Sequence, residues 1–152
     1  MFTTLLWFTL YIDKIITGTC KGTYEILANE VTSPSYPGYY GRRNCRWKIV
    51  APVGDVKLYF IDFELESVKD TSTGSETCHE SGSVKDQLSI FDGEDRDAWS
   101  LGTFCGDRIP SNITSSGRSL YLEFNSDDFV NKKGFKLKFE ITGTIKFVNI
   151  YT

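Results

Sequence analysis

The chain has 152 residues, which is long enough for one domain with a hydrophobic core and too short for two comfortable ones. Its formal net charge is only -3 and it has no basic run with interleaved aromatic residues, which argues against a nucleic-acid partner. Aromatic residues make up 14% of the chain and glycine occurs 13 times, a mixture that favours strands and tight turns over helices.

The chain opens with an apolar segment. Residues 1–16 are apolar but are interrupted by Asp13 and Lys14, so they are too short and too broken for an ordinary membrane helix. Small residues follow before Cys20, as in a secretory signal, although no Lys or Arg precedes the apolar run. We expect residues 1–19 to be a signal peptide; the alternatives are a buried N-terminal strand or a wrongly assigned start codon.

Four cysteines follow, at positions 20, 45, 78 and 105. None lies in a CxxC pair, and the single histidine, His79, cannot complete a Cys/His zinc site of the usual spacing. Behind a secretory signal, an even number indicates two disulfides, for which three pairings are possible. The sequential pairing, Cys20 with Cys45 and Cys78 with Cys105, is the simplest, and each bridge would stabilise the fold by about 3 kcal/mol.

The first half of the chain predicts two strands. Two prolines in residues 33–40 (SPSYPGYY) remove backbone donors, so this segment should wrap along an edge. Residues 45–49 (CRWKI) alternate with period two, and Val56, Leu58 and Phe60 share one face of the next run. The polar residues that follow, 67–84, are expected to form an exposed loop.

The second half of the chain predicts further strands. Residues 88–106 are expected to form a strand, an acidic turn and a short strand, and a loop with the glycosylation sequon at Asn112 follows. Residues 119–124 and 134–141 are the clearest strands, and we expect them to form one antiparallel hairpin. These short strands predict an all-β antiparallel sandwich, with residues 143–152 as a tail or an extra strand.

Three acids stand at the ends of strand-like runs. Glu66 and Asp86 occupy the inner ends of the two runs that flank the polar insert, and Asp127 follows the run SLYLEF. Clustered carboxylates raise one another's pKa unless a cation lies among them, and oxygen-only clusters suit calcium. The alternative is that all three are solvated. The remaining acidic run is expected to be a solvated turn; it comprises Asp92, Glu94, Asp95 and Asp97.

The aromatic residues are expected to lie mostly in the core. Trp47, Phe60, Phe124 and Phe139 belong to strand-like runs. Trp99 and Tyr39 lie in loop-like contexts, where we favour burial over exposure at a contact surface. No catalytic motif of the HExxH, GxSxG or P-loop type occurs, so we do not expect an enzyme.

A series of short segments carries a resemblance that extends over residues 20–141. In order they are Cys20, SPSYPGYY, CRWKI, APVG, LYFIDFELE, Cys78, DQLSIFDG, LGTFCG, SLYLEFNSD and GFKLKF. The series resembles the CUB domain, an extracellular β-sandwich with jelly-roll-like topology, and we place that domain at residues 20–142. The resemblance implies that the cysteines pair first with second and third with fourth.

Four side chains match the positions that a calcium-binding subset of this family uses. By resemblance, Glu66, Asp86 and Asp127 are the carboxylate ligands, and Tyr40 supports the site. Phe129 stands where the family usually has serine, and its main-chain carbonyl would be a further ligand. The spacing between Cys78 and Asp86 is longer than is usual in the family, so the loop beside the site must bulge.

The resemblance implies a secreted, non-catalytic module that binds an extracellular protein or glycan through loops around calcium. In related domains a basic side chain of the partner, typically lysine, meets the acids. Two alternatives stay open: a metal-independent module that binds carbohydrate or a protease, and a fragment of a larger secreted protease or receptor. The sequence predicts neither a nucleic-acid partner nor a membrane span.

Overall fold

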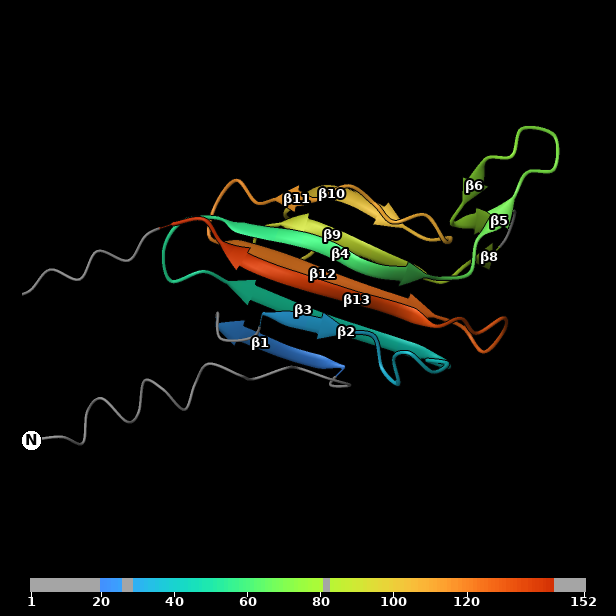
Figure 1. Cartoon of the computed structure of the whole chain (residues 1–152), viewed down its shortest axis with the longest axis horizontal. Helices are drawn as coiled ribbons and strands as arrows, with labels where there is room; N and C mark the ends of the chain where they lie inside the picture. Colours follow the sequence, from blue (N-terminus) through green and yellow to red (C-terminus); the bar gives the residue numbers. More distant parts are fainter. Residues whose placement is uncertain (1–19, 26–28, 81–82, 144–152) are drawn as a thin grey trace, which may run out of the picture.

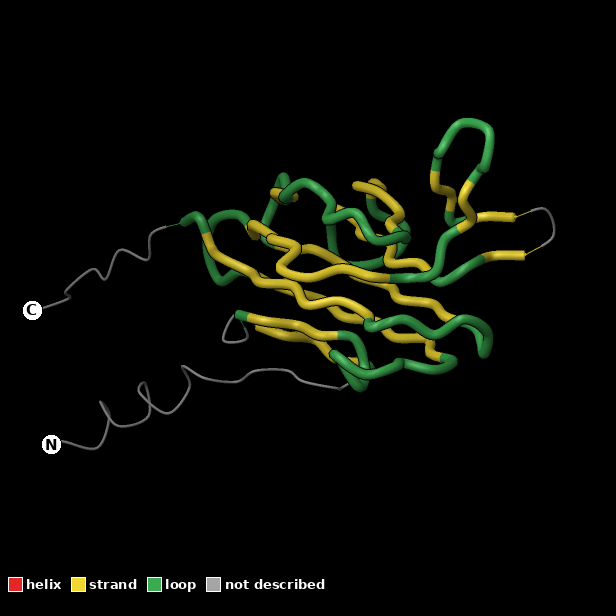
Figure 2. The backbone as a smooth tube through the Cα atoms, turned by 45° about the vertical axis from the view of Figure 1, so that its right-hand side comes forward, coloured by secondary structure: helices red, strands yellow, loops and turns green. Residues whose placement is uncertain are grey.

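The computed structural model describes residues 20–25, 29–80 and 83–143. The predicted signal peptide, residues 1–19, and nearly all of the predicted tail, residues 143–152, therefore lie outside the described residues. Every regular element in the described part is a β-strand (Figures 1 and 2). These residues include no helix with the length and hydrophobicity that a membrane crossing requires.

Two sheets form a sandwich, which confirms the predicted fold class. Neighbouring strands in each sheet are antiparallel, except that β1 and β3 run parallel. The first sheet has, in spatial order, β1 (Lys21–Glu25), β3 (Arg43–Val50), β12 (Ser119–Ser126), β9 (Gln87–Asp92) and β10 (Trp99–Phe104). The second has β11 (Ile113–Thr114), β4 (Val56–Glu64), β13 (Gly134–Ile141) and β2 (Glu30–Thr32).

The core lies between the two sheets and is built from the alternating apolar residues of the strands. The ring of Phe135 on β13 lies 5.9 Å from that of Trp47 on β3 and 5.2 Å from that of Phe124 on β12, centroid to centroid. All three rings are fully buried. Because successive strand residues point to opposite faces, the period-two runs of the sequence supply this interior from both sides. Phe60 and Phe139 are also buried, as predicted.

The predicted hairpin of residues 119–124 and 134–141 is wrong. β12 pairs with β3 and β9 in the first sheet, whereas β13 pairs with β4 and β2 in the second. Both strands carry a complete apolar face and each occupies an inner position of its own sheet. The segment between them, residues 127–133, therefore crosses from one sheet to the other at one end of the sandwich (Figure 1).

The polar insert of residues 67–84 is more regular than the predicted loop. It holds two short ribbons, which project beyond the end of the sandwich (Figures 1 and 2). The ribbons pair β5 (Val68–Lys69) with β6 (Glu76–Thr77), and β7 (His79–Glu80) with β8 (Ser83–Val84). The long spacing between Cys78 and Asp86 is thus taken up by the β7–β8 ribbon.

Two disulfides hold the described chain, Cys20 to Cys45 and Cys78 to Cys105. This is the sequential pairing that the sequence favours. The first ties the chain just before β1 to β3, and the second ties the insert to the end of β10. The second bridge therefore anchors the ribbons close to the start of β9, where Leu88 pairs with Phe104.

The predicted burial of Trp99 and Tyr39 is wrong. Their exposed fractions are 81% and 75%. Trp99 begins β10, an edge strand, and Tyr39 lies in the connection before β3, so neither has a second layer above it. Apolar patterning identified the core strands correctly, but an aromatic residue in a loop has no such pattern to place it.

Candidate metal centre

One end of the sandwich gathers the three predicted acids. Glu66 lies two residues beyond β4, Asp86 immediately precedes β9 and Asp127 immediately follows β12. Because β9 and β12 are antiparallel neighbours, the start of one lies beside the end of the other. One carboxylate oxygen from each residue lies within 4.8 Å of the other two. We call these residues the acidic cluster.

Two of the three carboxyl groups are withdrawn from water. Asp86 is fully buried and Glu66 is 5% exposed, whereas Asp127 is partly exposed. The buried Tyr40 hydroxyl donates a hydrogen bond to Asp86 Oδ2, and the Asp127 backbone N–H donates to Asp86 Oδ1 at 2.9 Å. Asp86 is thus held at both oxygens, one by the core and one by the loop after β12.

Hydrogen bonds between side chains and backbone also hold the loop after β12 in place. The N–H of Phe129 donates to Asp127 Oδ1 at 2.7 Å. The Ser126 hydroxyl donates to the Gly41 carbonyl at 2.6 Å and accepts from the Arg43 N–H at 2.8 Å. These bonds place the loop beside the segment that carries Tyr40. Hydrogen bonds therefore hold the backbone around the acidic cluster in a fixed position.

The electrostatics of the acidic cluster are compatible with a bound cation. Burial raises the pKa of Asp86 to about 6; the Tyr40 and Asp127 hydrogen bonds act against this, and the neighbouring carboxylates add to it. Burial, followed by the contact with Asp86, raises the pKa of Tyr40, so the hydroxyl stays a donor. Glu66 Oε2 is buried without a hydrogen-bond partner. Such an oxygen is costly unless a positive charge lies nearby, and calcium takes oxygen ligands of this kind.

Two further polar residues at this end of the sandwich were not predicted from the sequence. The Lys85 ammonium lies 3.1 Å from Glu66 Oε1. Asn131, in the crossing segment after β12, has a buried side-chain oxygen with no hydrogen-bond partner. A single Lys or Asn in a polar loop carries no distinguishing pattern, so only the folded chain identifies them. For Phe129, whose side chain is 71% exposed, the carbonyl ligand stays a prediction.

The dense acidic run begins at the last residue of β9, Asp92, and so lies at the end of that strand opposite to the acidic cluster. Glu94 forms an ion pair with Lys48 at 2.6 Å, and Asp92 accepts a hydrogen bond from the Ser116 N–H at 2.8 Å. Asp95 accepts from the Asp97 N–H within the turn. None of the four belongs to the acidic cluster, which agrees with the prediction of a solvated turn.

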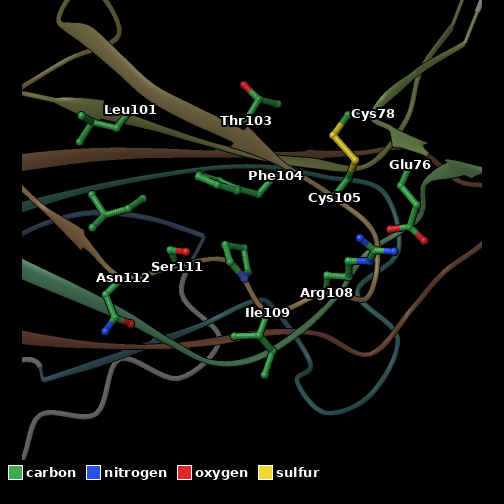
Figure 3. Close-up of a pocket in the computed structure, with 12 residues that line it drawn as sticks. Glu76, Cys78, Leu101, Thr103, Phe104, Cys105, Arg108, Ile109, Ser111 and Asn112 are labelled. Atoms are coloured by element: carbon green, nitrogen blue, oxygen red, sulfur yellow. A yellow bond between two sulfur atoms is a disulfide. The ribbon is translucent and has the colours of Figure 1, made fainter. Parts of the chain in front are cut away.

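A separate hollow of about 490 Å³ lies between β10 and the segment of residues 105–113 (Figure 3). The Cys78–Cys105 bridge, the ring of Phe104 and the exposed side chain of Ile109 line it. Asn112 also lines this hollow, and its side chain is exposed. The predicted glycosylation residue is therefore accessible from solvent, and its modification stays a prediction.

Replacing Tyr40 with phenylalanine should weaken calcium binding by about 10–100-fold, the usual cost of losing a side chain that orients a ligand. The ring would still pack edge-on against Phe124, 5.2 Å away, so the fold should persist. The hydroxyl's hydrogen bond to Asp86 disappears, together with the backbone hydrogen bonds that it accepts from Glu66 and Lys132. Calorimetric titration measures the affinity, and an unchanged affinity would show that Asp86 needs no support.

Asp86 should make the metal-free protein less stable as the pH rises. Burial raises the pKa of this carboxyl from 3.8 to about 6 in the folded state. Its stabilising contribution is therefore complete below about pH 4, the unfolded pKa, and is lost as the pH rises through about 6. In chelator, the unfolding free energy of the wild type should fall relative to Asp86→Asn by on the order of 2 kcal/mol between pH 4 and 7. Urea titrations at both pH values test this, and a constant difference would contradict it.

Comparisons with known proteins identify the family to which this sandwich is similar. A family model described as the CUB domain matches residues 20–139. Human tolloid-like protein 1 is 34% identical over 119 residues, which are 77% of this chain and 11% of that protein. Dog cubilin is 33% identical over 137 residues, which are 89% of this chain and 3% of that protein. The chain thus spans only a small part of these curated relatives.

Among solved structures, the crystal structure of the MASP-1 CUB2 domain bound to Ca2+ superposes with a TM-score of 0.61 at 25% identity. The match covers 81% of this chain and 98% of that one. The extracellular region of zebrafish Gpr126/Adgrg6 gives a TM-score of 0.63 at 30% identity, over 80% of this chain and 14% of that one. The likeness therefore extends over nearly all of the described sandwich.

Proposed function

Because the chain belongs to the CUB domain family, we propose that it is a secreted binding module that recognises an extracellular protein through a calcium ion held by the acidic cluster. CUB domains are interaction modules of larger extracellular proteins. The observation that carries the calcium proposal is the convergence of Glu66, Asp86 and Asp127 within 4.8 Å, with one buried oxygen left without a partner. The similar MASP-1 CUB2 domain, whose structure contains Ca2+, supports it.

The acidic cluster supplies the hard oxygens that calcium prefers. The three carboxylates and the Phe129 carbonyl would hold the ion, with waters completing its six to eight ligands. Tyr40 keeps Asp86 in place from the core side. A bound calcium ion would neutralise part of the clustered negative charge and tie the loop after β12 to the ends of β4 and β9. The negative charge that is not neutralised would form an acidic surface whose side chains are already ordered before a partner binds.

Exposed apolar side chains lie in the two loops next to the acidic cluster. Tyr39, Phe129 and Val130 are 75%, 71% and 56% exposed, and we call them the apolar rim. Their two loops lie side by side, because Ser126 Oγ bonds the Gly41 carbonyl. We propose that the rim packs against apolar groups of the partner while a basic side chain of the partner meets the cluster. A preordered surface of this kind loses little entropy on binding.

A capture experiment tests this function. The immobilised protein is exposed to native extracellular fluid with calcium and then with excess chelator. We expect a partner that elutes in chelator and that Phe129→Ser captures less well, while Ile61→Ser, which alters an exposed apolar residue of β4 outside the apolar rim, behaves like the wild type. Equal capture in chelator would favour the metal-independent alternative.

Two features of the mature protein belong to the same proposal. Secretion is supported by the two disulfides, which persist in oxidising compartments, and by the signal-like residues 1–19. A glycan on the exposed Asn112 is supported by its sequon. The mass of the secreted protein before and after removal of N-linked glycans tests both, because an unmodified, uncleaved chain would contradict them.

The alternative that the chain is a piece of a larger secreted protein has its own support. The chain spans 11% of tolloid-like protein 1 and 3% of cubilin. A module of this size would then serve the larger protein by binding. Sequencing the full transcript distinguishes the two cases.

A further inference from the structure

Lys85 lies next to two residues of the acidic cluster, Asp86 and Glu66. It immediately precedes Asp86, and its ammonium is 3.1 Å from Glu66 Oε1. The side chains of this pair are only 19% and 6% exposed. The Lys85 N–H donates to the Cys78 carbonyl at 3.0 Å, next to a disulfide, so the backbone that carries the ammonium is anchored.

The other lysines near this end pair with acids outside the acidic cluster. Lys132 lies 3.8 Å from Glu64, and Lys133 lies 2.7 Å from Asp62. Lys69 bridges Glu76 and Asp107. Of the ion pairs described in the structure, the one between Lys85 and Glu66 is the one that reaches a cluster acid. Its position, rather than a general excess of lysine, brings a positive charge to the proposed calcium ligands.

We infer that Lys85 is a built-in cation of the acidic cluster, which neutralises Glu66 when no calcium is bound and opposes calcium when it binds. This inference rests on the proposed calcium site. The ammonium occupies one oxygen of Glu66, and the other oxygen is buried without a partner. A fixed positive charge a few ångströms from a dication repels it, so Lys85 sets a higher calcium requirement than the three acids alone would have.

The same contact limits the cost of the metal-free state. Without calcium, three carboxylates within 4.8 Å repel one another. The Lys85 ammonium offsets one of these charges, so the loops of the cluster can stay folded. Lys85 therefore lowers the affinity for calcium and raises the stability of the metal-free protein.

Calcium titrations of Lys85→Gln and the wild type test this inference. Removing one positive charge beside the site should tighten calcium binding about tenfold. Lys85→Arg, which keeps the charge, should stay within about threefold of the wild type. Lys48→Gln is the matched control, because this lysine is also paired and partly buried but lies near the opposite end of the sheet, where salt screens its effect. In chelator, Lys85→Gln should melt below the wild type, and calcium should raise its melting temperature by more.

The outcomes separate this inference from the calcium proposal. If the wild type binds calcium and Lys85→Gln binds it equally or more weakly, the inference is overturned and Lys85 merely supports Glu66. If neither protein binds calcium, the proposed calcium site fails, and the inference fails with it. Lys85→Met, which keeps the apolar stem, replaces Lys85→Gln with the same expectation if the latter does not fold.

Discussion

Asp127→Ala should bind calcium at least about 100-fold more weakly than the wild type, because it removes one of the three proposed carboxylate ligands. The carboxylate lies within 4.8 Å of the other two, and it also holds the Phe129 N–H at 2.7 Å. The backbone N–H that bonds Asp86 is retained in the variant, so the loop should keep one of its anchors. Isothermal titration of chelator-treated protein measures the loss.

Asp128→Ala is the matched control for that prediction. This neighbouring side chain is 65% exposed, pairs with Arg42 at 3.6 Å and lies outside the acidic cluster. We expect its calcium affinity to stay within about twofold of the wild type, because an exposed charge is well screened. Equal losses in both variants would mean that net charge, rather than coordination, governs the binding.

Phe135→Ala should lower the unfolding free energy by about 3–5 kcal/mol, the usual cost of removing a buried phenylalanine ring. This ring is fully buried and contacts Trp47 and Phe124 across the sandwich and Phe63 within its own sheet, at centroid distances of 5.9, 5.2 and 6.5 Å. Side chains of both sheets pack against this ring, so its removal would leave a cavity between the sheets. Urea denaturation measures the change.

Two companion substitutions make the core prediction sharper. Phe135→Leu retains most of the apolar volume and should cost about 1.5 kcal/mol or less. Phe129→Ala removes the same ring from a site that is 71% exposed, and it should change stability by no more than about 0.5 kcal/mol. A Phe135→Ala protein as stable as Phe129→Ala would contradict the described packing.

The strands could be predicted because alternation is a local pattern, and the acidic cluster could be predicted from acids at strand ends together with the family resemblance. Alternation in residues 45–49 and 134–141 identifies a buried face, and the side chains of Trp47 and Phe135 lie there. Acids at strand ends meet when the strands are neighbours, as Asp86 and Asp127 do through β9 and β12. Alternation does not identify which strand becomes the neighbour, which is why residues 119–124 and 134–141 were wrongly paired.

The remaining differences come from contacts that the sequence does not encode locally. Trp99 and Tyr39 are exposed because the fold places nothing over an edge strand and a connecting loop, although aromatic residues are usually covered. Lys85 and Glu66 stand on either side of the insert in the sequence, and they become partners only in the folded chain. The insert of residues 67–84 is likewise tied to the end of β10 by the bridge from Cys78 to Cys105, which joins positions far apart in the sequence.

Anomalous diffraction from crystals grown in calcium would test the central claim most directly. The proposal predicts a single calcium peak among Glu66, Asp86 and Asp127, about 2.3–2.6 Å from an oxygen of each carboxylate. Crystals of Asp127→Ala grown in the same solution should lack that peak. A wild-type map with no calcium among the three acids, at calcium concentrations typical of extracellular fluid, would contradict the proposal.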